Sequence, residues 1–193
     1  EGFNKVAVSN PFAWVRSPMT AEEIKTPRPS NRMVGYPYTK SMNANSFVDY
    51  GGAIIVCSVE KAQMLGISRD RWVFPHVATD GNASYLFSQR ESFHESPAMR
   101  ITGQRCFELA GLSVDEVGHM DLYSCFPSCV QLIMTELGIS SDRVVTTTGG
   151  LPFFGGPMNS YVIHAIASTV DAIRETGEMG YVHANGGYAT KQA

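Results

Sequence analysis

Short apolar runs alternate with longer stretches of helical periodicity from residue 51 to the end of the chain. A strand followed by a helix that leads to the next strand is the unit from which layered α/β sheets are built. We therefore expect an α/β fold with a mixed or mostly parallel sheet and helices on both faces. The predicted strands span residues 53–56, 71–78, 118–122, 144–147 and 181–184.

Capping residues mark the ends of the predicted helices. Ser58 is expected to cap a helix that stops at Gly66, because serine accepts the orphan amides of a first turn and glycine ends helices readily. Ser96 and Pro97 give the N-cap and first turn of a second helix that ends near Gly111. Further predicted elements are a capping-box turn at 113–116, a helix over 127–137 closed by Gly138, and a long helix over 157–175 that begins at Pro157.

The first fifty residues differ in character from the rest. Residues 1–42 hold five of the ten prolines and show little regular periodicity, yet they carry several aromatic side chains that need a surface to pack on. We expect 1–50 to be a loop-rich arm and the end of a preceding domain, and 51–193 to be a C-terminal domain whose last strands are truncated. A start at Glu1 without methionine is typical of a fragment or a processed product.

The composition excludes several classes of function. A net charge of -3 with no basic run gives no footprint for nucleic acid, and no stretch is apolar enough to cross a bilayer. The four cysteines lack the spacing of a zinc site and are expected to be reduced thiols. The sequence predicts a cytoplasmic protein with no metal site and no tightly bound cofactor.

Loops after predicted strands are where open α/β sheets bind ligands, and three such junctions carry unusual chemistry. The first runs from Asp121 to Cys129, where Tyr123 and Cys125 lie close to a helix N-terminus that stabilises negative charge. Either side chain could act as a nucleophile or proton relay. The alternative is that both cysteines are small core residues and that Ser124 caps the helix.

The other two junctions are rich in glycine. Residues 149–159 contain two glycine pairs, which let a backbone approach a ligand closely or serve only a tight turn. Residues 183–188 place a histidine and an asparagine beside a third glycine pair. His183 is interpreted as a packed strand residue, and Asn185 as the more promising functional group.

Taken in order, these junctions resemble landmarks of the C-terminal portion of the thiolase superfamily. Residues 43–53 resemble the family's Asn-Ala-Ser-Gly stretch, which contacts the pantetheine arm of coenzyme A and implies that role for Asn45 and Ser46. Residues 123–126, Tyr-Ser-Cys-Phe, fall where thiolases have Asn-Glu-Ala-Phe and the sterol-carrier-protein type has His-Asp-Cys-Phe. The match implies a thiolase-like layered fold. In that fold residues 123–126 would belong to the family's second catalytic loop, and the helix from Pro97 to Gly111 would precede this loop.

The glycine-rich junctions match two further family motifs and depart from both. Gly155 and Gly156 fall at the Gly-His-Pro turn, and the segment ending at Gly186 falls at the final Cys-x-Gly motif. Gly156 stands in place of the oxyanion-hole histidine, and Ala184 or Asn185 in place of the acid/base cysteine. None of the four cysteines occupies the nucleophile motif, which belongs to the N-terminal half of the family. Ordinary thiolysis by this chain is therefore not expected.

The resemblance implies a protein that binds coenzyme A thioesters as substrates. The parent enzyme is expected to act on carbon–carbon bonds of lipid- or sterol-derived acyl-CoA, as an acyltransferase or by retro-aldol cleavage, with Tyr123 and Asn185 as catalytic groups and Asn45, Ser46, Gly155, Gly156 and Gly186 contacting the CoA ester. The family also implies a homodimer and a small zinc-ribbon or OB-fold partner. The alternatives are a non-catalytic scaffold subunit and an inactive fragment.

Overall fold

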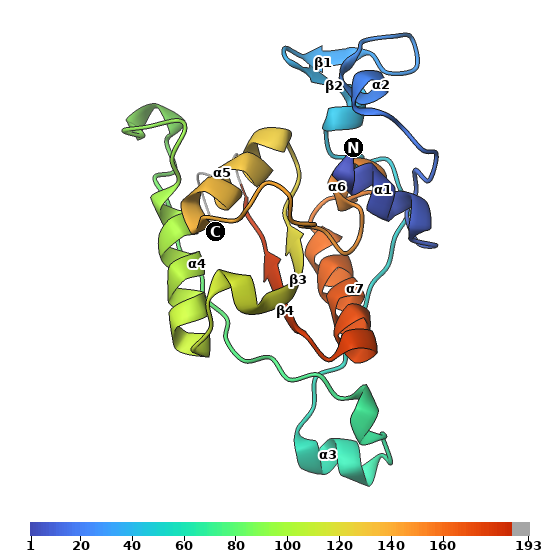
Figure 1. The fold of residues 1–193 in the computed structure, drawn as a ribbon, viewed down its shortest axis with the longest axis vertical. Coiled ribbons are helices and arrows are strands. Elements are labelled where there is room, and N and C mark those ends of the chain that lie inside the picture. Colours follow the sequence, from blue (N-terminus) through green and yellow to red (C-terminus); the bar gives the residue numbers. More distant parts are fainter. Residues whose placement is uncertain (187–193) are drawn as a thin grey trace.

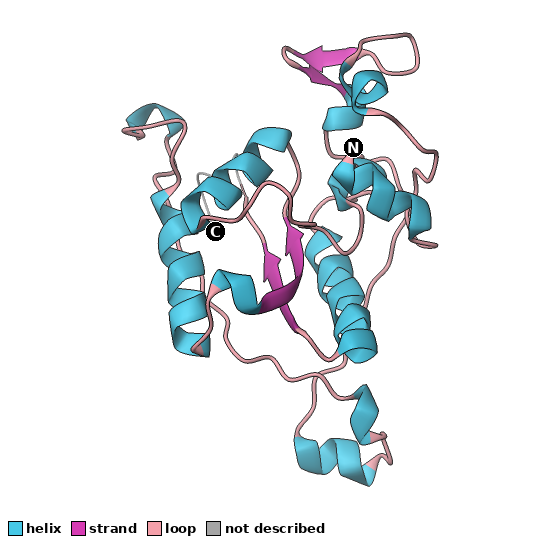
Figure 2. Cartoon of the chain, in the orientation of Figure 1, coloured by secondary structure: helices cyan, strands magenta, loops and turns pink. Residues whose placement is uncertain are grey.

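Two parallel strands lie at the centre of the computed structural model, which describes residues 1–186 (Figure 1). β3 (Val117–Leu122) pairs with β4 (Met179–His183), and Leu122 lies opposite His183. Helices α4 (Pro97–Ala110) and α5 (Pro127–Leu137) cover one face of the pair, and α7 (Tyr161–Thr176) covers the other (Figure 2). The expected α/β layering with helices on both faces is confirmed.

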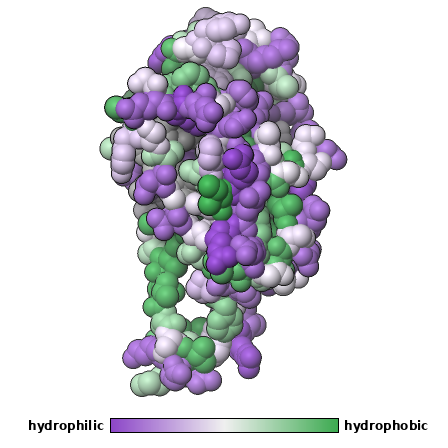
Figure 3. All heavy atoms as spheres, turned by 90° about the vertical axis from the view of Figure 1, so that its left-hand side faces the viewer, coloured by the Kyte–Doolittle hydropathy of each residue, from purple (hydrophilic) through white to green (hydrophobic). Residues whose placement is uncertain are grey.

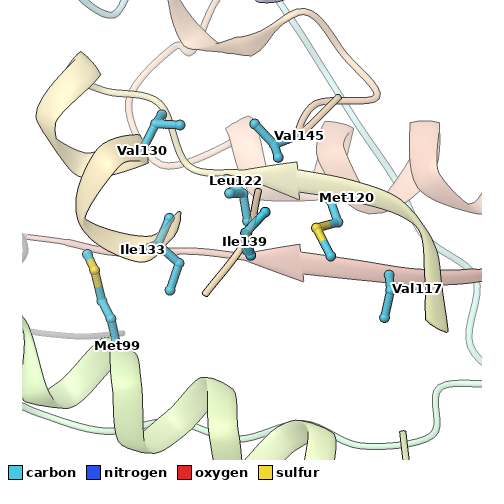
Figure 4. Packing of buried hydrophobic residues seen from close by; sticks show 8 residues of the cluster. All are labelled: Met99, Val117, Met120, Leu122, Val130, Ile133, Ile139 and Val145. Atoms are coloured by element: carbon cyan, nitrogen blue, oxygen red, sulfur yellow. The ribbon is translucent and has the colours of Figure 1, made fainter. Parts of the chain in front are cut away.

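One hydrophobic core fills the space between β3, α4 and α5. Met120 and Leu122 share this face because successive strand residues point to opposite sides. Met99 of α4 points toward Ile133 of α5, and both are fully buried (Figure 4). The other members of this cluster are Val117, Val130, Ile139 and Val145.

A second core lies on the opposite side, around α7. It contains Leu151 and Phe153 of α6 (Gly150–Phe153) and Tyr161 at the start of α7. Gly180 of β4 approaches α7 so closely that an added Cβ would lie 2.9 Å from Ile173 Cδ1. The absence of a side chain there is what lets the helix lie flat on the strand.

Asp121 joins the two layers. It lies between Met120 and Leu122 on β3, points toward α7 and is completely buried. Its Oδ1 accepts a hydrogen bond from the Tyr161 hydroxyl at 2.7 Å, and its Oδ2 accepts from the backbone amides of Thr147 and Thr148 at 2.9 and 3.1 Å. Burial raises the pKa of Asp121, whereas the hydrogen bonds from these residues act in the opposite direction.

The N-terminal segment is more regular than its sequence indicates. Residues 2–42 form α1 (Gly2–Ser9), α2 (Ala21–Lys25), an antiparallel pair of short strands and the 3-10 turn η1 (Lys40–Met42). The expectation of a loop-rich arm is wrong for α1, because tertiary packing stabilises this short helix. Its Ala7 contacts Gly149, where an added Cβ would lie 2.5 Å from the Ala7 Cβ. The short strands are β1 (Met33–Gly35) and β2 (Tyr38–Thr39).

The expected strands at 53–56 and 71–78 are wrong, since neither stretch pairs with another strand among residues 1–186. Both are extended chain on either side of α3 (Val59–Met64), which projects from the layered part of the molecule (Figure 1). Ile55 and Val56 are 87% and 81% exposed. A β-branched run becomes a strand only where a neighbouring edge supplies hydrogen bonds.

The expected strand at 144–147 is also absent from the described sheet. Leu122 N donates to Val145 O at 3.0 Å, but the amides of Thr147 and Thr148 then turn to the Asp121 carboxylate. A side chain therefore takes the place of the backbone ladder at this edge.

Most predicted helix ends are confirmed. Ser58 caps α3 by accepting from Lys61 N, and Gly66 follows α3 with a φ of 65°. Gly111 and Gly138 end α4 and α5 in the left-handed conformation. The remaining 3-10 turns are η2 (Arg69–Arg71), η3 (Phe87–Gln89) and η4 (Val114–Glu116), the last of which carries the predicted capping box.

The long helix begins later than expected. α7 starts at Tyr161 rather than Pro157, since Met158 adopts a φ of 52° and breaks the helical path. The glycine pair Gly149-Gly150 leads into the short helix α6, which periodicity did not predict. Among residues 1–186, no helix has the length and apolarity needed to cross a membrane.

We predict that Asp121→Ala lowers the free energy of unfolding by about 3 kcal/mol or more, because it strands buried donors on the Thr147–Thr148 turn and on Tyr161. Asp121→Asn keeps one acceptor oxygen and should cost less. Chemical denaturation measures both. The matched control, Asp115→Ala, removes an exposed carboxylate and should change stability by about 0.5 kcal/mol or less. An equal loss in Asp115→Ala and Asp121→Ala would contradict the prediction.

Candidate functional site

The turn after β3 is held against the glycine-rich turn at α6. Ser124 is buried, and its Oγ accepts a hydrogen bond from Leu151 N at 3.0 Å. An added Cβ on Gly150 would lie 2.7 Å from the same oxygen, so the glycine permits this contact. Two junctions that are far apart in sequence therefore meet at Ser124, as the sequence predicts. The Ser124 side chain thus connects the turn after β3 with the turn at α6, and it does not cap α5.

Residues 44 and 45 connect the same two turns through their backbone. Ala44 N donates to Cys125 O at 3.2 Å, Asn45 N donates to Leu151 O at 3.0 Å, and Gly156 N donates to Asn45 O at 2.9 Å. The predicted CoA-contacting stretch thus lies beside both junctions. Asn45 is half-buried and Ser46 is exposed. Their assignment to CoA binding stays a prediction.

Gly155 and Gly156 are buried by close packing. Gly155 has a φ of 109°, and an added Cβ would lie 2.9 Å from Val48 Cγ2. At Gly156 an added Cβ would lie 2.9 Å from Leu151 Cδ2. No side chain fits at either position without movement of these neighbours. Because Gly156 N already bonds to Asn45 O, its amide is not free for a ligand. A role of this pair in ligand contact also stays a prediction.

Asn185, which belongs to the third junction, lies next to the turn after β3. It is buried just beyond β4, and its Oδ1 accepts a weak hydrogen bond from Cys125 Sγ at 3.9 Å. Its Nδ2 is buried and has no hydrogen-bond partner among residues 1–186. A buried amide donor without a partner carries a desolvation cost, which a ligand acceptor would offset.

A groove of about 2260 Å³ adjoins the junctions at Tyr123 and Asn185, and residues 45, 46, 155 and 156 are not among those that line it. Tyr123, Cys125, Asn185 and Gly186 line it at one end, and β4 and α7 form one wall. The extended stretch 53–57 lines the other side, and hydrophobic side chains are exposed along the chain near α3 (Figure 3). The volume exceeds the roughly 300–1,000 Å³ of an ordinary ligand pocket. An elongated ligand with an apolar part would fit such a surface.

Tyr123 is half-buried at the mouth of this groove. Its ring packs edge-to-face on Tyr161, with ring centroids 5.6 Å apart. No residue of 1–186 forms a hydrogen bond with its hydroxyl. Burial raises the pKa of Tyr123, and the neighbouring sulfur atoms of Cys125 and Cys129 raise it further. The phenol is therefore a protonated donor at neutral pH.

Sequence reasoning treated two features of this site as ordinary core residues. His183 is buried, and within the described part of the chain neither ring nitrogen has a hydrogen-bond partner. Burial lowers its pKa to about 4, which keeps the ring neutral. Cys125 Sγ and Cys129 Sγ lie 3.4 Å apart in a thiol–thiol contact. The four-residue spacing was the available signal for this pair.

Other groups are not brought together. His76 and Asn159 line the groove along its length, but they lie on separate segments of the chain. Residues 1–186 contain no group of three His, Cys, Asp or Glu side chains placed to bind a metal ion. The predicted junction residues Gly187 and Tyr188 lie outside the described residues.

Solved structures have the same fold. The chain aligns with a monomeric SCP2-thiolase-like protein type 1 from Mycobacterium smegmatis at 35% identity and a TM-score of 0.87, covering 99% of this chain and 42% of that one. The chain belongs to the thiolase superfamily. The Ltp2–ChsH2(DUF35) aldolase has the same fold at 18% identity and a TM-score of 0.67, covering 98% of this chain and 54% of that one.

Sequence comparison gives the same superfamily. The benzoylsuccinyl-CoA thiolase subunit BbsB of Thauera aromatica is 24% identical in an alignment of 185 positions, gaps included, that covers 87% of this chain and 46% of the relative. An acetyl-CoA acetyltransferase of Methanocaldococcus jannaschii is 22% identical in an alignment of 192 positions, gaps included, that covers 90% of this chain and 45% of the relative. This thiolase-fold chain thus spans less than half the length of these curated relatives. No protein-family model matches it.

We predict that burial of neutral His183 makes stability depend on pH. Its pKa is about 4 in the folded protein against 6.5 as the ordinary value, so the unfolded chain binds more protons between these limits. Stability should fall by about 3 kcal/mol as the pH falls from about 6.5 to about 4. Denaturation at several pH values measures the loss.

His183→Phe should remove most of that pH-dependent difference, because the phenyl ring cannot gain a proton. The control His94→Phe replaces an exposed imidazole, with a side chain 88% accessible, and should leave the dependence unchanged. If the pH profile of His183→Phe matched that of the parent protein, another group would be responsible.

Proposed function

We propose that this chain forms the thioester-binding part of an enzyme that cleaves or forms a carbon–carbon bond in an acyl-CoA. The observation that carries the proposal is that the side chains of Tyr123 and Asn185 line one groove, and that neither the Tyr123 hydroxyl nor Asn185 Nδ2 has a hydrogen-bond partner among residues 1–186. The thioester would lie at this end of the groove, and the apolar lining would accommodate a lipid- or sterol-like acyl group.

Two absences argue against thiolysis. Gly156 leaves no imidazole at the oxyanion position, and Ala184 leaves no thiol acid/base at the final motif. Removing one oxyanion donor typically costs about 3 to 4 kcal/mol of barrier. A reaction that uses a phenol and an amide instead fits the residues better.

Retro-aldol cleavage of a β-hydroxyacyl-CoA is such a reaction. The β-hydroxyl loses its proton, the bond between Cα and Cβ breaks to give a carbonyl product, and the electron pair passes to the thioester as an enolate. Asn185 Nδ2 would donate to the enolate oxygen, and a proton added at Cα would complete the acyl-CoA product. The phenolate form of Tyr123, which is scarce at neutral pH, would take the hydroxyl proton in cleavage, and the resulting phenol would return it in condensation.

The contacts to coenzyme A are proposed from the resemblance to the thiolase superfamily. Asn45 and Ser46 lie beside both turns and would contact the pantetheine arm, with Gly155, Gly156 and Gly186 lining its path. The aldolase with the same fold is described together with a DUF35 partner, which supports a small zinc-ribbon or OB-fold partner here. We also propose a homodimer and a cytoplasmic location, consistent with four free thiols.

A non-catalytic scaffold is the second candidate. It is favoured by the packing of Leu151 against Gly156, because the side chain of a catalytic histidine is excluded from that position. A scaffold would bind acyl-CoA without turning it over.

We predict that the purified protein cleaves a β-hydroxyacyl-CoA and does not thiolyse acetoacetyl-CoA. Steady-state assays with both substrates, and calorimetry with a non-reactive acyl-CoA, separate the candidates. Binding without turnover of either substrate would support the scaffold. Turnover of acetoacetyl-CoA would contradict the aldolase proposal.

Tyr123→Phe should lower kcat for cleavage by about 100-fold or more, since the proton acceptor is lost while the ring packing on Tyr161 remains. The cleavage rate of the parent protein should rise with pH above neutrality, because the raised pKa of Tyr123 keeps the phenolate scarce. Tyr85→Phe removes an exposed phenol and is the matched control. An unchanged rate and pH profile in Tyr123→Phe would remove this residue from the mechanism.

A further inference from the structure

Two thiols are in contact at the junction between β3 and α5. Cys125 Sγ lies 3.4 Å from Cys129 Sγ, and both side chains lie on the inner side of the Tyr123 turn. A disulfide has a sulfur–sulfur bond of about 2 Å, so its closure requires a shift of roughly 1.4 Å. None of the free cysteines takes part in the chemistry proposed above.

The backbone at this junction permits the two sulfur atoms to approach further. Cys125 precedes the helix N-cap, Phe126, and Cys129 lies on the first turn, where its amide donates to Phe126 O at 3.1 Å. Only Cys129 is constrained by helical backbone geometry.

The surroundings give the two thiols different reactivities. The hydrogen bond from Cys125 lowers the pKa of Cys129, and the same contact raises the pKa of Cys125. The nearby helix N-terminus also stabilises a thiolate. Cys125 lines the groove, whereas Cys129 is buried behind it. An oxidant in the groove meets Cys125 first, and the thiolate of Cys129 stands directly behind it.

We propose that Cys125 and Cys129 form a reversible redox pair that a peroxide in the groove converts to a disulfide. The Cys125 proton first passes across the 3.4 Å contact to the Cys129 sulfur. The resulting Cys125 thiolate attacks the peroxide, becomes a sulfenic acid and releases hydroxide, which takes the proton from Cys129 and leaves as water. The Cys129 thiolate then attacks the Cys125 sulfur and displaces hydroxide, which takes up a proton. In sum, two thiols lose two protons and two electrons, and one hydrogen peroxide is reduced to two water molecules.

Oxidation would change the candidate site directly. Cys125 has a single S–H proton, for which Cys129 Sγ at 3.4 Å and Asn185 Oδ1 at 3.9 Å are the two acceptors in the reduced protein, and a disulfide has no such proton. Asn185 would then lose its one described side-chain partner and be free to turn its amide. This consequence rests on the proposed function, whereas formation of the disulfide does not.

The test is peroxide titration of the purified protein, followed by alkylation of the remaining thiols and peptide mass mapping. The expected result is a mass loss of two hydrogen atoms within the peptide that contains both residues, with fragmentation placing the link between Cys125 and Cys129. Dithiothreitol should restore both thiols. Cys57 is exposed and serves as an internal reference for peroxide dose.

Cys129→Ser and Cys125→Ser should each abolish the link, because either change removes one of its sulfur atoms, while Cys57→Ser and Cys106→Ser should retain it. Melting curves establish whether the variants are folded. If a variant is unfolded, peptide mass mapping of the unsubstituted protein alone tests for the link between Cys125 and Cys129. The proposal is overturned if Cys57 is fully oxidised before any link forms, or if Cys125 links to a different cysteine. Because mass mapping does not measure turnover, its failure is distinct from failure of the aldolase proposal.

Discussion

The buried carboxylate of Asp121 is the interaction on which the rest of this structure depends. It lies on β3 and accepts hydrogen bonds from the Thr147–Thr148 backbone and from Tyr161 of α7, so one side chain ties a strand, a turn and a helix together. A buried charge is tolerated only when its lone pairs are satisfied. The turn at 146–148 is therefore fixed relative to β3, although it forms no strand with it.

The geometry of the candidate site depends on the hydrogen bonds of Asp121. Once Thr148 is bound to Asp121, the chain that follows must pass beside the end of β3, which brings Leu151 N to Ser124 Oγ. Tyr123 directly follows Asp121 and Leu122 of β3, so the positions of these two residues determine where Tyr123 lies. Tyr161 provides a second connection, since its hydroxyl bonds to Asp121 while its ring packs on Tyr123. A change that loosens the carboxylate network would move the phenol of Tyr123 as well.

Local signals predicted some of this well. Pro127 and Gly138 fixed both ends of α5, because their effects on the backbone do not depend on distant residues. The apolar runs at 53–56 and 71–78 failed as strands, since pairing depends on an edge that residue type alone cannot supply. The Asp121 network was invisible for a related reason: its partners are 26 to 40 residues away along the chain. The convergence of Tyr123 and Asn185 followed from the α/β topology, whereas the contact of Cys125 with Cys129 needed side-chain positions.

The groups left without partners gather at the carboxyl end of the central strands. His183 and Asn185 are both buried there with unused polar atoms, while Asp121, two residues before Tyr123, is fully satisfied. Each unpaired buried polar group costs about 1–3 kcal/mol, so the folded chain is less stable than an apolar equivalent at this end. The satisfied network and the unsatisfied groups are separated by only a few residues along each strand. The satisfied carboxylate of Asp121 thus supplies rigidity at the same end of the sheet, directly beside the polar groups that are available to a ligand.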